Sequence, residues 1–169
     1  RSRGLGDVYK RQFPDESRFN DPAYAELTYT RFAKSLLATP TTRLCAYATT
    51  SRTATETLMK ALAKFGFAGY VGKVNMDRNC AAGLLETTEE TIAQTRLWLE
   101  ETKDGIGAIY PILTPRYFPS CTESCLEQLG ELAEEYHVPV QSHLSEGLDE
   151  IDWVHELAPD LDYYAQAYD

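Results

Sequence analysis

The chain has 169 residues, the length of one ordinary domain with a sizeable core. Hydrophobic residues make up 43%, too many for a disordered protein, and 16 basic against 26 acidic residues give a formal net charge of −10. This charge argues against a nucleic acid or an anionic membrane surface as partner, because both bind basic faces, whereas a small neutral substrate remains compatible. No apolar run approaches the roughly 20 residues of a membrane span.

The chain contains four cysteines, and none of them forms a Cys-x-x-Cys pair. A zinc ribbon and a thioredoxin-like redox motif are therefore disfavoured, and the count is too low for a disulfide scaffold. There is no N-terminal apolar segment of the kind that forms a secretory signal. We therefore predict reduced thiols and a cytoplasmic protein.

In chain order, residues 1–12 come first; they are basic and lack an amphipathic pattern, so we interpret them as a non-native or disordered leader. A helix over 21–37 follows, with Asp21 as a possible cap and Pro22 in its first turn. Apolar periodicity and breakers then predict the remaining elements. These are strands at 44–49, 70–76, 108–114 and 138–146, and helices at 54–65, 88–103, from Ser120 to Tyr136, and 148–157, with capping boxes at Thr87/Glu90 and Ser120/Glu123.

Strand starts near residues 44, 70, 107 and 138 are the spacing expected of strand-helix repeats in a parallel sheet. Four such units predict an α/β fold with the helices outside and the carboxyl ends of the strands at one edge. They are compatible with a small doubly wound sheet or with half of an eight-stranded barrel, which usually needs about 250 residues.

The fourth predicted strand runs directly into two chemically active side chains. Its apolar start, Val138-Pro139-Val140, is followed by His143 and then by Glu146. In parallel α/β folds ligands bind at the carboxyl ends of strands, where an imidazole can bind a metal and a carboxylate can take a proton from water. The alternative is a histidine that simply closes a core strand.

Polar side chains also follow the second and third predicted strands: Asn75 and Asp77 after one, Arg116 and Tyr117 after the other. At a shared sheet edge they would line a site for a polar planar ligand, since a guanidinium can donate to a carbonyl oxygen. Alternatively, Asp77 caps a loop and Arg116 pairs with a surface acid. Gly-rich phosphate loops, a nucleophile elbow and a His-Glu-x-x-His motif are all absent.

In combination, these stretches resemble the guanine deaminases of the amidohydrolase superfamily. The likeness covers roughly residues 13–169. The stretches that carry it, in order, are residues 13–19 (FPDESRF), 71–79 (VGKVNMDRN), 113–117 (LTPRY), 141–146 (QSHLSE) and 164–169 (YAQAYD).

The resemblance implies that residues 13–169 are an incomplete metal-dependent hydrolase domain, a partial (β/α)8 barrel near strands two to five. It implies conversion of guanine and water to xanthine and ammonia with one zinc ion. His143 would bind the metal and Glu146 would be the general acid/base. Arg116 would bind the guanine carbonyl oxygen and Tyr117 would lie near the base, although the family more often has Phe at this position.

The resemblance also implies zinc ligands that this sequence lacks, a His-x-His pair and a further His and Asp. We therefore expect the chain alone to be inactive and the complete protein to be a homodimer. Two alternatives stay open. One is another amidohydrolase, a deaminase or chlorohydrolase-type enzyme acting on a different ring; the other is a non-catalytic α/β binding domain.

Overall fold

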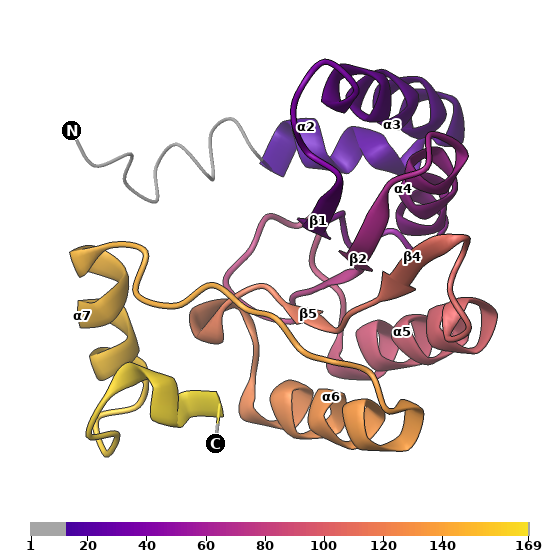
Figure 1. Cartoon of the computed structure of the whole chain (residues 1–169). Helices are drawn as coiled ribbons and strands as arrows, with labels where there is room; N and C mark the ends of the chain where they lie inside the picture. Colours follow the sequence, from indigo (N-terminus) through magenta and orange to yellow (C-terminus); the bar gives the residue numbers. More distant parts are fainter. Residues whose placement is uncertain (1–12, 169) are drawn as a thin grey trace.

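The computed structural model describes residues 13–168 and the side chains from residue 15 onward, so the predicted leader, 1–12, lies outside the described residues. Helices make up most of the described chain (Figure 1). They are α2 (Phe13–Ser17), α3 (Pro22–Leu36), α4 (Arg52–Lys64), α5 (Thr88–Thr102), α6 (Glu123–Tyr136) and α7 (Leu148–Leu157), with short 3-10 turns η2 (Arg18–Asn20), η3 (Phe118–Ser120) and η4 (Tyr164–Tyr168).

The strand pairs are all parallel, as predicted, and helices separate β1 from β2 and β3 from β4. Three of them form a sheet in the order β1 (Arg43–Tyr47), β2 (Ala68–Gly72) and β4 (Ala108–Pro111). Short strands β3 (Val74–Asn75) and β5 (Thr114–Pro115) pair beyond them. This is the α/β architecture of a partial barrel.

The predicted strands 70–76 and 108–114 are each divided in two, and close packing at the division explains why. A Cβ on Gly72 would lie 1.7 Å from the Thr114 hydroxyl and 2.7 Å from the Ile112 carbonyl oxygen. The two chain segments therefore approach each other at Gly72 more closely than any side chain there would allow. Pro111 is the last residue of β4, where the missing N–H interrupts a ladder that already ends.

The two faces of the three-stranded sheet differ sharply. Helices cover one face, and the core there includes Val71 and Ile109 together with Trp98 of α5, all fully buried. On the other face Tyr70 and Tyr110 are in register and 41% and 46% exposed. A sheet covered by helices on one face only is what an arc of a (β/α)8 barrel presents.

The predicted fourth strand, 138–146, does not form, and this prediction was wrong. Only an isolated bridge joins Val140 to Leu113, and Val140 is 50% exposed. The backbone N–H of Gln141 donates to the Leu113 carbonyl, and that of His143 donates to the Arg116 carbonyl. Between these two hydrogen bonds the segment 141–143 advances two residues while the segment 113–116 advances three, so a regular ladder cannot continue.

Side chains cap the helices mostly where the sequence predicts. Asp21 accepts from the Ala23 N–H at the start of α3, and Thr87 and Glu90 form the full capping box of α5. The predicted Ser120/Glu123 box is wrong, because Thr122 is the cap of α6. Ser120 belongs to η3, and its hydroxyl donates to the Tyr117 carbonyl instead.

Helix α7 lies on the other side of the strands from α4 and α5 (Figure 1) and packs against η3 and η4. Among the described residues, none of the helices has the length and apolar character needed to cross a bilayer.

Gly69 in β2 provides a first testable prediction. It has a φ of +135°, and a Cβ would lie 1.9 Å from the Leu44 carbonyl oxygen. We expect Gly69→Ala to lower the free energy of unfolding by about 1–3 kcal/mol, measured by urea denaturation. The matched control is Gly130→Ala in α6, which meets no atom within 4 Å and should stabilise the helix by up to about 1 kcal/mol. Equal effects of the two substitutions would contradict the prediction.

Candidate functional site

His143 lies in the extended segment after α6, against the backbone of Arg116. Its ring Nδ1 is 2.8 Å from the Arg116 carbonyl oxygen, and its backbone N–H donates to the same oxygen at 3.0 Å. A carbonyl can only accept, so Nδ1 carries the proton and Nε2 presents a lone pair. This is the tautomer and the kind of orienting hydrogen bond that metal-binding histidines use.

Tyr47, at the end of β1, packs its ring against the His143 ring with centroids 4.4 Å apart. Burial raises the pKa of Tyr47 to about 12, and neighbouring groups that include Glu146 add to the shift. The Tyr47 hydroxyl therefore stays neutral, and the Tyr47 ring forms one side of the site next to His143.

Arg116 follows β5 and is almost buried. Its Nη1 donates to the Glu16 carboxylate at 3.1 Å and lies 3.9 Å from the sulfur of Met76. Its backbone N–H donates to the Asn75 carbonyl at 3.2 Å. The acid that pairs with Arg116 is thus a buried one from α2, and the surface pair considered as an alternative is wrong.

The neighbouring residue, Tyr117, has an extended backbone, with φ −170° and ψ 163°. Successive side chains of an extended segment point in opposite directions. The Tyr117 ring accordingly meets Trp153 of α7 edge-on, at 6.3 Å between centroids, while Arg116 reaches Glu16.

Glu146 lies on the loop before α7 with an exposed side chain. Its backbone N–H donates to the Glu150 carboxylate at 3.2 Å, and the preceding Ser145 has a φ of +54°. The loop therefore turns sharply between His143 and α7, leaving the Glu146 carboxylate free of the core and close enough to influence Tyr47.

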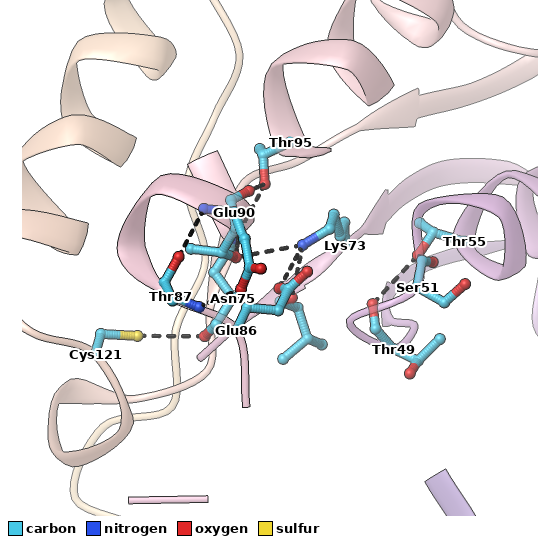
Figure 2. Close-up of polar contacts among 12 residues, drawn as sticks. Thr49, Ser51, Thr55, Lys73, Asn75, Glu86, Thr87, Glu90, Thr95 and Cys121 are labelled. Carbon is cyan, nitrogen blue, oxygen red and sulfur yellow. Dashed lines mark hydrogen bonds and ion pairs between the residues drawn. The ribbon is translucent and has the colours of Figure 1, made fainter. Parts of the chain in front are cut away.

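The structure brings together Arg116 and His143, as predicted, but not all strand-end polar groups join them. Asn75 is fully buried, and its amide donates to the hydroxyls of Thr91 at 2.9 Å and Thr95 at 2.7 Å (Figure 2). Its place in a ligand site is thus a wrong prediction. Asp77 accepts from the Thr122 N–H and the Thr88 hydroxyl, each at 2.7 Å, so it holds the starts of α5 and α6 together.

Figure 2 also shows a buried cation that the sequence does not reveal. The ammonium of Lys73 is fully buried, 3.0 Å from the Glu86 carboxylate and 3.3 Å from the Thr91 hydroxyl. Burial lowers the pKa of Lys73, and Glu86 acts in the opposite direction. This pair closes the long loop between β3 and α5.

Two contributors to the site are missed by sequence reasoning. Glu16 is one, although it lies within a stretch that supports the resemblance. The other is Tyr168, whose hydroxyl accepts from Ser142 at 2.8 Å and donates to the His143 carbonyl at 3.2 Å. The tyrosine-rich tail was the available signal. By contrast, His137 and His155 are exposed.

Comparisons with known proteins show the family of this chain. The family described as "Amidohydrolase family" matches residues 3–166. Guanine deaminase from Dictyostelium discoideum is 39% identical over 160 residues, covering 94% of this chain and 36% of that protein. The chain thus spans about a third of the length of the curated relatives it matches.

Solved structures give the same result. A guanine deaminase from C. acetobutylicum, with guanine bound in its active site, superposes with a TM-score of 0.94 at 40% identity. It is matched over 97% of this chain and 39% of that one. A mutant of the atrazine chlorohydrolase TrzN from Arthrobacter aurescens, complexed with zinc and atraton, superposes at 0.74 with 12% identity over 88% of this chain and 35% of its own, which shows a shared fold alone.

Proposed function

Because this chain belongs to the amidohydrolase family, we propose that it is the part of a guanine deaminase that recognises the purine and supplies one metal ligand. The observation that carries the proposal is the direct link between the His143 ring and the backbone of Arg116. A single carbonyl, that of Arg116, orients the His143 ring through Nδ1. The residue proposed to bind guanine thereby fixes the residue proposed to bind the metal.

His143 fits a zinc ligand, because its Nε2 carries the lone pair that can bind a metal ion. Among the described residues, no three His, Cys, Asp or Glu side chains are grouped to hold a metal ion. We therefore assign one ligand to this chain and the others to the parts of the relatives that it does not span. When bound, zinc would lower the pKa of a water so that it can attack near neutral pH.

The remaining steps fall to residues of this chain. Arg116 donates to the carbonyl oxygen of guanine, which distinguishes an oxo from an amino purine. Tyr117, whose ring turns away from Arg116 toward Trp153, lies near the base through its backbone. Glu146, on its exposed loop, accepts a proton from the attacking water and returns it to the ring nitrogen, so that no full negative charge develops on the purine.

A deamination assay tests the proposal on the complete protein that carries this chain. We expect the protein to convert guanine to xanthine and ammonia, to lose this activity after treatment with a chelator, and to regain it with Zn²⁺. The isolated chain of residues 1–169 serves as the comparison and should show no turnover. Turnover of a triazine but not of guanine would reject the proposed substrate, and robust turnover by the isolated chain would reject the division of the metal site.

A homodimer in the cytoplasm belongs to the same proposal. Light scattering on the complete protein tests the dimer, and cell fractionation tests the compartment. Three solved guanine deaminases are 27–40% identical to this chain, against 12% for TrzN, and this difference supports guanine over a triazine.

A further inference from the structure

We propose that Glu16 is a positioning residue for substrate recognition: its carboxylate fixes the Arg116 guanidinium in the orientation that reads the carbonyl oxygen of an oxopurine. The inference rests on the proposed function and adds a residue from outside the strand ends. It starts from the Glu16–Arg116 pair, whose side chains are only 10% and 11% exposed.

Each of the two buried charges is unfavourable unless the opposite charge lies beside it. An arginine stays charged in a protein, and burying it without an anionic partner is strongly unfavourable. Burial raises the pKa of Glu16, while the nearby Arg116 charge and the hydrogen bond to it lower the pKa again. The bond of 3.1 Å between the two is therefore charge-assisted, which makes it stronger and more directional than a neutral one.

Arg116 is held at its other end as well. The backbone N–H is bonded to the Asn75 carbonyl, and the backbone carbonyl accepts from the backbone and ring of His143. With the backbone fixed, the remaining freedom lies in the side-chain torsions, and Glu16 limits these. A guanidinium carries five N–H groups in a rigid plane, so holding one nitrogen while the backbone is fixed restricts the directions of the others.

A nearby ion pair shows how different Glu16 is from a surface acid. Asp15, the preceding residue, pairs with Arg18 at 3.7 Å, and those side chains are 75% and 58% exposed. Such exposed pairs contribute little. Asp15 and Glu16 lie on the same short helix, α2, so substitutions at the two positions compare a surface carboxylate with a buried one in one local structure.

The test uses the complete protein with Glu16→Gln, Glu16→Asp and, as control, Asp15→Asn. Two substrates are compared: guanine, and 2,6-diaminopurine, which carries an amino group where guanine has its carbonyl. For Glu16→Gln we expect the KM for guanine to rise about tenfold with a smaller change in kcat, as loss of one charge-assisted hydrogen bond predicts. The preference for guanine over 2,6-diaminopurine should fall by a similar factor. Asp15→Asn should leave both values unchanged.

Glu16→Asp keeps the charge on a shorter side chain, so its preference should lie between those of the wild type and the glutamine variant. If the glutamine variant does not fold, the aspartate variant decides, and a wild-type preference there overturns the inference. A purely structural role would reduce the activity on both purines equally, which also overturns it. Guanine turnover by the wild type with an unchanged preference in Glu16→Gln rejects the inference alone, whereas no turnover by the wild type rejects the proposed function with it.

Discussion

Replacing Glu146 with glutamine should lower kcat for guanine deamination by roughly 10³-fold, the size of a lost general acid/base, with little change in KM. Glutamine keeps the shape of the side chain but cannot accept a proton from water. The Glu146 side chain is exposed on its loop, so the substitution should not affect folding. Steady-state kinetics on the complete protein measures the effect.

The zinc content of the variants distinguishes the role of Glu146 from that of His143. The Glu146→Gln protein should keep its zinc, measured by atomic absorption, whereas His143→Ala should lose both metal and activity. Asp149→Asn, an exposed carboxylate in the first turn of α7, is the matched control and should behave as wild type. Loss of zinc from the Glu146→Gln protein would instead make that carboxylate a ligand.

The second large effect concerns stability. Glu86→Gln should lower the free energy of unfolding by about 3 kcal/mol, because it leaves the fully buried Lys73 ammonium without its anionic partner. Urea denaturation followed by circular dichroism measures it. Glu135→Gln, which removes a half-exposed partner of Arg96, is the control and should have little effect.

Removing the buried cation instead of its partner should destabilise the fold much less. Lys73→Met eliminates the desolvated charge and leaves Glu86 partly exposed to water, so its destabilisation should be less than half that of Glu86→Gln. Burial holds the pKa of Lys73 in the folded state below its ordinary 10.5. Between the pKa of the folded state and 10.5, the folded state therefore binds fewer protons than the unfolded state. Wild-type stability should therefore rise with pH in that window, and the methionine variant should lack this rise. Equal losses in the two variants would contradict the assignment of the cost to an unpaired buried charge.

The sequence predicts the α/β order well because local signals decide it. Periodicity locates the helices, and Asp21 and Thr87 cap them as expected. The failure at 138–146 has a non-local cause: the run has the right residue types, but its partner strand is broken near Leu113, and the pairing slips before His143. Composition carries no information about the register of a partner.

The candidate site is predictable to a similar extent. The segment after α6 runs parallel to the third unit, with a parallel bridge between Val140 and Leu113, so the meeting of Arg116 and His143 follows from the predicted chain order even without a fourth strand. Asn75 was misplaced because strand alternation puts it on the same side as Val71 and Lys73, facing the helices. The partner of Arg116 could not be inferred, since any of many acidic residues could have served.

The Glu16–Arg116 pair joins residues 100 positions apart in the chain, whereas each strand-helix unit is built from near neighbours. Contacts of such long range require a large loop to close and therefore form slowly. We expect the sheet and its helices to assemble first and α2 to dock onto Arg116 near the end of folding. Losing the pair would then accelerate unfolding while leaving the folding rate nearly unchanged. The recognition site would thus be the last part of this region to form and the first to open.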